Sequence, residues 1–377
     1  MAIQHVYLIP GFFGFTSLGS LNYFLGVREL LMERLAAHGV DAVVHETETL
    51  PTGSIRHRAV RLLMRVEKER AFAGDVGIHF VGHSTGGLDA RLLVTPGVRL
   101  VDSDLEQVIG DHVRSVQTLS TPHHGTPLAN FFTTLQGRNL LYILTLLATT
   151  DTGRLGVTAL AQSLSLVARL DDFLGNTDTL LDHLSDRLLK SISPDRRHRL
   201  WEFMNEVSRD QGAVIQLMPE AIDLFNAAVF DRPTVRYVSH ITAAPPPFSR
   251  ARLSDLTDFY APLGLALYAL VHRLASREHR AYPYPALSAD AARTISSHLS
   301  FPVTHGTNDA IVPSLSQVWS EIGQVVEGDH LDVVGQYGRE YQGARIPSWL
   351  KSGAGFDDAR MFHLWDAIAR VIAETAS

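Results

Sequence analysis

Short apolar segments alternate with amphipathic ones along the first third of the chain. Apolar segments that stop at a glycine and are followed at once by residues with helical periodicity are typical of buried strands that enter helices. The predicted strands here are residues 6–9, 40–44 and 76–81, and the predicted helices are residues 27–37 and 54–70. Repetition of strand and helix predicts a parallel sheet covered by helices on both faces.

Later segments extend this pattern. Residues 113–119 are predicted to form another strand, and an apolar run leads to residues 302–306, where a strand is expected just before a turn. A proline-rich stretch at residues 243–247 breaks the chain, and residues 256–275 are predicted to form a helix. The expected class is α/β with a mostly parallel central sheet and helices on both faces.

The alternation stops between residues 130 and 230, where helical patterns follow one another. Residues 155–170 and 179–192 are predicted helices of this segment. We interpret residues 130–230 as a helical cap, inserted into an α/β core that is formed by residues 1–129 and 231–377.

Composition excludes several classes of function. The 377 residues are 45% hydrophobic and 19% charged, which is typical of a folded chain that buries a full core. A formal net charge of −7 without long runs of lysine or arginine argues against nucleic acid as a partner. The sequence has no cysteine, so a thiolate metal site, a disulfide and a cysteine nucleophile are excluded.

Membrane and export signals are not recognised in the sequence. No run of about 18 apolar residues is free of charge, so we expect no transmembrane segment. The first residues lack a basic start followed by an apolar core, so we expect no secretory leader to be encoded here. The compartment stays open, because a leader can be removed.

Residues 82–86, Gly-His-Ser-Thr-Gly, match the G-x-S-x-G pattern of the nucleophile elbow, which predicts the α/β-hydrolase fold for the core at residues 1–129 and 231–377. Such an elbow needs a strand before the serine, a helix after it, and small residues where the tight turn meets its neighbours. The apolar run before Gly82 and the segment after Gly86 supply the strand and the helix. Ser84 is therefore the predicted nucleophile, and a turn serine without chemistry is the alternative.

A serine nucleophile needs a base to take its proton and a carboxylate to orient that base. In this fold the chain order is serine, acid, histidine. Asp309 is the predicted acid, because it follows an expected strand and lies in a glycine-containing turn at residues 306–313. His330 is the predicted base, since it lies on the next loop, after an apolar run at residues 324–326.

Other residues compete for these two roles. Asp329 and Asp332 are the alternative acids, but each is so close in sequence to His330 that contact with its Nδ1 would be awkward. His363 is the only histidine after His330. It lies in a predicted helix at residues 357–373, where a surface or packing role is expected.

Attack on an ester creates an oxyanion that preorganised backbone amides stabilise. One expected donor is the amide of Thr85, directly after the nucleophile. The other is expected in the loop after the first strand, Pro-Gly-Phe-Phe-Gly at residues 10–14, where Phe12 is the first choice and Phe13 the second. The alternative is that these phenylalanines are core residues.

These motifs together resemble the bacterial triacylglycerol lipases, the true lipases that carry a structural calcium ion. The matching segments are the loop at residues 10–14, the elbow at residues 82–86, Ser-Thr-Pro-His-His-Gly-Thr at residues 120–126, and Asn308-Asp309 followed by His330-Leu331-Asp332. Two features depart from that family. Pro10 stands where its members usually have histidine. Those lipases are also secreted, whereas we expect no secretory leader to be encoded here.

The resemblance also implies a structural Ca²⁺ site. The places of its ligands are occupied here by Asp332, Gln336 and Asp290. Carboxylate and amide oxygens suit a hard cation of this kind. The alternative is ordinary surface polarity, with Asp332 paired to an arginine.

The leading hypothesis for function is hydrolysis of carboxylic esters with apolar acyl chains, through an acyl-enzyme on Ser84. An uncharged apolar stretch at residues 140–147 of the predicted cap suggests an acyl pocket and transient contact with a lipid surface, and a buried helix is the alternative. An esterase for short or polymeric esters is the alternative, because substrate choice lies in the cap. A non-catalytic binding protein on this fold is the alternative from another class.

Overall fold

The computed structural model describes most of the chain outside the centre of the predicted cap. The described ranges are residues 3–12, 17–18, 21–69, 76–101, 104–134, 209–250, 261–279, 284–346 and 350–376, with a few single residues between them. The predicted helices at residues 155–170 and 179–192, the apolar stretch at residues 140–147, and Phe13 lie outside the described residues.

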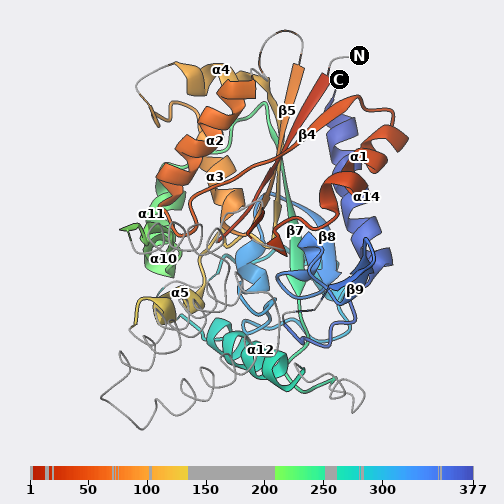
Figure 1. Ribbon diagram of the computed structural model, residues 1–377. Coiled ribbons are helices and arrows are strands. Elements are labelled where there is room, and N and C mark those ends of the chain that lie inside the picture. The colour runs from red at the N-terminus through yellow and green to blue at the C-terminus, as the bar shows by residue number, and fades with distance from the viewer. Residues whose placement is uncertain are drawn as a thin grey trace, which may run out of the picture.

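A six-stranded sheet forms the centre of the molecule (Figure 1). Its strand order is β4-β1-β5-β6-β7-β8, and every neighbouring pair runs parallel. The strands are β1 (Ile3–Ile9), β4 (Ala42–Glu46), β5 (Val76–His83), β6 (Val113–Leu119), β7 (Arg236–Ala243) and β8 (Glu321–Glu327). The predicted mostly parallel sheet is confirmed.

Helices cover both faces of this sheet (Figure 1). One face carries α1 (Val27–Ala37) and α14 (Asp358–Thr375), and the other carries α2 (Ile55–Glu69), α3 (Thr85–Val94) and α4 (Leu105–His112). Strand β1 is apolar throughout its second half because it is buried on both sides. Val6 and Leu8 enter the cluster under α1 and α14, while Tyr7 and Ile9 enter the cluster on the other face.

The remaining elements lie around the carboxyl-terminal ends of the strands or at the edges. They are α5 (Pro127–Phe132), α10 (Gly212–Gln216), α11 (Pro219–Ala228), α12 (Ala261–Ala275), α13 (Ala289–Ser297), and two small hairpins formed by β2 (Ser17–Leu18) with β3 (Leu21–Asn22) and by β9 (Arg339–Tyr341) with β10 (Ala344–Ile346). Helix α10 is bound to the core by two backbone hydrogen bonds, from Ala213 to Thr52 and from Thr126 to Leu217. The end of the predicted cap therefore packs on the core, and the boundaries of the cap stay a prediction.

One strand was placed wrongly by the sequence pattern. Residues 302–304, where a strand was expected, form no strand, and the sheet instead contains β7, which the pattern did not indicate. Strand β7 is buried but carries the polar side chains of Ser239, His240 and Thr242. Each of them is hydrogen-bonded to a neighbouring segment, so burial does not require an apolar residue there.

Residues near the two ends of the described chain meet at one side of the sheet (Figure 1). The side-chain amide of Gln4, at the start of β1, donates to the carbonyl of Ala376, which follows α14. Among the described residues, no helix combines the length and the apolar character needed to cross a bilayer.

Candidate active site

Ser84 lies in a strained turn between β5 and α3. Its backbone has φ 55° and ψ −130°, a left-handed conformation that is costly for a residue with a side chain. A Cβ on Gly82 would lie 2.4 Å from the amide nitrogen of Gly87, and one on Gly86 would lie 2.3 Å from the carbonyl oxygen of Ile9. The two motif glycines are therefore required by close backbone contacts, as in a nucleophile elbow.

The loop after β1 packs directly against this elbow. A Cβ on Gly11 would lie 2.4 Å from the Cβ of Ser84, so only glycine fits there. Two side chains hold the loop in place. Arg58 donates from Nη2 to the carbonyl of Pro10 at 2.7 Å, and the hydroxyl of Tyr23 accepts the amide N–H of Gly11 at 2.7 Å.

The two predicted oxyanion donors belong to the elbow and to the loop that packs against it. Thr85 is the first residue of α3, and Phe12 follows Gly11 in the loop that touches the elbow. Phe12 is partly buried and packs against an apolar cluster that contains Leu88 of α3. Phe13 lies outside the described residues.

A buried ion pair fixes the side chain of Arg58, which holds the same loop. The guanidinium of Arg58 on α2 contacts both carboxylate oxygens of Asp89 on α3, at 3.1 and 2.9 Å from Nε, and both side chains are fully buried. Nη1 of Arg58 donates to the carbonyl of Leu50 at 2.6 Å. Since a buried charge without a partner costs several kcal/mol, about 3–5 in measured cases, this pair fixes α2, α3 and the loop relative to one another.

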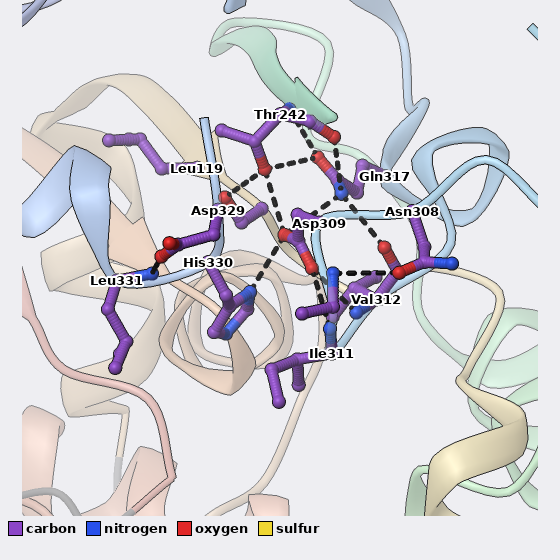
Figure 2. A network of polar contacts seen from close by, with 12 residues as sticks. Leu119, Thr242, Asn308, Asp309, Ile311, Val312, Gln317, Asp329, His330 and Leu331 are labelled. Atoms are coloured by element: carbon purple, nitrogen blue, oxygen red, sulfur yellow. Dashed lines mark hydrogen bonds and ion pairs between the residues drawn. The ribbon is translucent and has the colours of Figure 1, made fainter. Parts of the chain in front are cut away.

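Asp309 and His330 are in direct contact (Figure 2). His330 Nδ1 lies 2.8 Å from Oδ2 of Asp309, and the Asp309 side chain is fully buried. The same oxygen also accepts from Thr242 Oγ1 of β7 at 2.8 Å and from Gln317 Nε2 at 3.1 Å. A carboxylate offers only acceptors to Nδ1, so the hydrogen of the neutral imidazole lies on Nδ1 and leaves Nε2 free to accept a proton.

Backbone groups hold the other carboxylate oxygen. Oδ1 of Asp309 accepts the amide hydrogens of Ile311 at 3.0 Å and Val312 at 2.7 Å (Figure 2). The loop of His330 is bonded to the same turn, because the amide of His330 donates to the carbonyl of Asp309 at 2.9 Å. Five donors therefore surround this buried carboxylate, which fixes its orientation toward the imidazole.

The alternative acids and the alternative base contact other partners. Asp329 accepts from the amides of Leu331 and Asp332, and Asp332 accepts from the amide of Asp329 at 2.8 Å. Burial raises the pKa of the Asp329 carboxyl to about 7, so it is a poor partner for an imidazolium. His363 is exposed on α14 and contacts the ring of Phe362.

His330 and the elbow meet through the residue that precedes the nucleophile. His83 Nε2 lies 2.9 Å from the carbonyl oxygen of His330, and the two imidazole rings are 4.7 Å apart. No hydrogen bond joins Ser84 to His330 in the described part of the chain. In unliganded enzymes such bonds are often long, and they tighten when substrate binds.

The three predicted calcium ligands do not form one group. Asp290 on α13 has a side chain that is 87% exposed and paired with Arg293, whereas Asp332 is buried beside Asp329. Gln336 donates its side-chain amide to the carbonyl of Asn22. In the residues described, no group of three or more histidine, aspartate or glutamate side chains is arranged to hold a metal ion. Calcium binding stays a prediction that rests on Asp332 and Gln336 without Asp290.

A cavity of about 690 Å³ lies away from the triad. It is lined by α13, by the segment before β8 and by the loop after β6, with His124, Trp319 and Asp290 among its residues. Trp319 Nε1 donates to both oxygens of Asp231, which also lines the cavity. None of its lining residues belongs to the predicted triad, so we assign it no part in the reaction.

Sequence reasoning missed several residues that position the site. Thr242 and Gln317 hold Asp309, Arg58 holds the loop after β1, and Tyr23 and His83 link that loop to His330. The elbow histidine was visible in the motif at residues 82–86, yet its partners come from distant segments that no local spacing connects.

Comparisons with known proteins find similar lipases. No protein-family model matches the chain. A triacylglycerol lipase of Pseudomonas fragi is 28% identical over 125 residues, which are 33% of this chain and 36% of that protein. A triacylglycerol lipase of Vibrio cholerae is 30% identical over 125 residues, 33% of this chain and 34% of that one. The match thus spans about a third of the length of these relatives.

Solved structures extend the likeness over the whole chain. The lipase of Staphylococcus hyicus superposes with a TM-score of 0.53 at 16% identity, covering 99% of this chain and 95% of that one. The chain has the α/β-hydrolase fold of bacterial lipases. Lipase 1 of Pelosinus fermentans shares this α/β-hydrolase fold with the same TM-score and covers 99% of both chains. The resemblance to bacterial lipases that the motifs predicted is confirmed.

Proposed function

We propose that the protein is a serine carboxylic ester hydrolase with Ser84 as nucleophile, His330 as base and Asp309 as acid. The observation that carries this proposal is the 2.8 Å contact between His330 and the buried Asp309, made beside a strained serine elbow. The relatives named as triacylglycerol lipases support the same class of reaction.

The reaction begins when His330 Nε2 takes the proton of the Ser84 hydroxyl and Oγ attacks the ester carbonyl carbon. The carbonyl oxygen becomes an oxyanion, for which the amides of Phe12 and Thr85 are the proposed donors. His330 then gives its proton to the leaving alkoxide, and an acyl ester on Ser84 remains. Water, deprotonated by His330, attacks this acyl-enzyme, and His330 returns that proton to Ser84 Oγ as the acid is released. Asp309 stabilises the imidazolium that forms in each half of the reaction.

We propose esters with apolar acyl chains as the substrates. Ile311 and Leu331, the neighbours of the acid and the base, pack against one apolar cluster together with Leu128 and Phe131 of α5. An apolar wall beside the triad suits an acyl chain better than a polar one. The role of the predicted cap in chain-length choice, and transient contact with a lipid surface, stay predictions.

A second candidate is an esterase for short acyl chains. An esterase structure, EstA of Clostridium botulinum, superposes on this chain with a TM-score of 0.53 at 17% identity, covering 98% of this chain and 87% of that one. The triad chemistry is the same for both candidates, so the difference lies in the acyl site.

The deciding experiment measures hydrolysis of p-nitrophenyl esters of increasing acyl length by the wild type and by Ser84→Ala. We expect activity that rises toward longer chains in the wild type and is lost in the variant. A p-nitrophenyl phosphonate should phosphonylate Ser84 with release of p-nitrophenolate, so that a peptide containing Ser84 gains the mass of the phosphonyl group. Activity retained by Ser84→Ala would contradict the proposed nucleophile, and a maximum at the shortest esters would favour the esterase.

A further inference from the structure

Two buried side chains join the oxyanion loop to the loop of the base. The hydroxyl of Tyr23 lies 2.7 Å from the amide nitrogen of Gly11 and 2.7 Å from Nδ1 of His83. Nε2 of His83 lies 2.9 Å from the carbonyl oxygen of His330. One continuous series of hydrogen bonds thus runs from the loop that precedes Phe12 to the residue proposed as base.

The direction of each bond follows from the chemistry of its ends. The carbonyl of His330 can only accept, so Nε2 of His83 carries the hydrogen. In a neutral imidazole Nδ1 then accepts, and the donor is the hydroxyl of Tyr23. The oxygen of that hydroxyl accepts the amide hydrogen of Gly11, which completes the series with every group satisfied.

Burial favours the neutral forms that this series requires. His83 and Tyr23 are both buried. Burial and the neighbouring His330 lower the pKa of His83 well below its usual range, and burial raises the pKa of Tyr23. The hydrogen-bond pattern is therefore retained throughout the neutral range of pH.

The segment that carries Tyr23 is itself fastened to the loop of the base. The amide of Leu25 donates to the carbonyl of Val334 at 2.9 Å, and Gln336 donates to the carbonyl of Asn22. Tyr23 therefore moves with the residues that follow His330. Displacement of this segment would move the amide at Gly11 as well.

We propose that Tyr23 and His83 are positioning residues that lock the oxyanion loop and the loop of His330 into one rigid frame around Ser84. This inference rests on the proposed function. The amide proposed as an oxyanion donor, that of Phe12, directly follows Gly11, which touches Ser84. An error of about 1 Å in such a donor can reduce turnover about 100-fold without weakening ground-state binding to the same extent.

The test replaces Tyr23 by phenylalanine and compares it with a matched control, Tyr337→Phe. Tyr337 is buried in the same apolar cluster as Tyr23, and its hydroxyl is bonded to Asp358 and Arg339 instead. We expect Tyr23→Phe to lower kcat for a p-nitrophenyl ester about 10- to 100-fold with KM changed less than about threefold, while Tyr337→Phe keeps kcat within about twofold.

The readout is kcat per site titrated with a p-nitrophenyl phosphonate. A merely structural role would increase the fraction of unfolded enzyme. That fraction does not react with the phosphonate, so it leaves kcat per titrated site unchanged. A second pair, His83→Gln and His83→Leu, covers the case in which Tyr23→Phe does not fold. Glutamine keeps an N–H able to reach the carbonyl of His330, so we expect its kcat per site to lie between that of the wild type and that of His83→Leu.

Two outcomes separate the positioning role from the proposed function. If the wild type hydrolyses esters but Tyr23→Phe and His83→Leu keep kcat per titrated site within about twofold, the positioning role is overturned and the proposed function stands. If the wild type neither hydrolyses esters nor reacts with the phosphonate at Ser84, both are overturned.

Discussion

Replacement of Asp309 by asparagine tests the proposed triad most directly, because the structure shows which way the new amide must face. Its oxygen has to remain with the backbone amides of Ile311 and Val312, since two N–H groups cannot become acceptors. The NH₂ group then takes the position of Oδ2. It points at Thr242, Gln317 and His330, which are the three residues bonded to Oδ2 in the wild type.

Two of these three neighbours lose a bond to Asp309 without affecting the chemistry. The hydroxyl of Thr242 can rotate toward Ser120 or Gln317. The amide of Gln317 keeps its bonds to the backbone of Thr242 and Val312 and gives up only its bond to residue 309. His330 can accept from the NH₂ only by moving its hydrogen from Nδ1 to Nε2, and that tautomer cannot take a proton from Ser84. In a serine protease the same substitution lowers kcat about 10⁴-fold, so we expect a loss of about 10³- to 10⁴-fold here, equal to about 4–5.5 kcal/mol in the barrier.

The assay is kcat for p-nitrophenyl ester hydrolysis at neutral pH, with thermal unfolding measured alongside. The loss of charge in hydrogen bonds that remain formed should destabilise the fold by about 1–3 kcal/mol, so a cooperative melting transition is expected. Asp329→Asn is the matched control, because that carboxyl is also buried beside His330 but bonded to backbone amides of its own loop. A loss of less than about tenfold in folded Asp309→Asn, or a larger loss in Asp329→Asn, would refute the assignment of the acid.

Three further predictions concern the nucleophile, pH and calcium. Ser84→Ala, His330→Ala and the double variant should lose similar factors in kcat, because members of a triad act as a unit, and additive losses in steady-state assays would contradict this. Burial lowers the pKa of His79 to about 3, so the unfolded chain binds a proton below about pH 6.5 that the folded chain rejects. Because of His79, the free energy of unfolding should be about 2 kcal/mol lower at pH 5 than above pH 6.5. Denaturant titrations should show a smaller drop in His79→Gln. A chelator should lower the melting temperature if Asp332 and Gln336 hold calcium, as Asp332→Ala should, while Asp290→Ala leaves the effect of the chelator unchanged; an unmoved transition in the wild type would exclude the site.

The bounds of helix α1 and strand β6 are those that the sequence predicted. In α1 the buried residues Val27, Leu31 and Leu35 recur at helical spacing. Strand β6 begins and ends at the apolar residues Val113 and Leu119, although polar residues between them are also buried. Strand β7 was missed since its buried polar side chains are satisfied by partners that lie far away in the sequence, such as Gln117 for His240. A rule based on apolar runs cannot detect such a strand.

Some residues of the candidate site could likewise be predicted from the sequence, and others could not. The elbow motif and the chain order indicated Ser84, Asp309 and His330, and the structure brings Asp309 and His330 together beside the residue that precedes Ser84. The geometry of Asp309 was anticipated for an incorrect reason, because the strand expected before it does not exist and its turn is instead held by β7. The calcium ligands came from the resemblance alone, and Asp290 shows that motif spacing does not fix the position of a helix such as α13.

The meeting of Gln4 and Ala376 has a practical consequence for handling the enzyme. Strands β1 and β5 are parallel, so the start of β1 and the end of β5 lie at opposite ends of the strands. Gln4 and Ala376 therefore lie on the side of the sheet away from Ser84. A resin or carrier protein attached to the chain next to Ala376 would therefore leave the strand ends that carry Ser84 facing the solution. A short peptide bridge between Gln4 and Ala376 could also close the backbone into a ring, whose reduced chain entropy in the unfolded state should slow thermal inactivation.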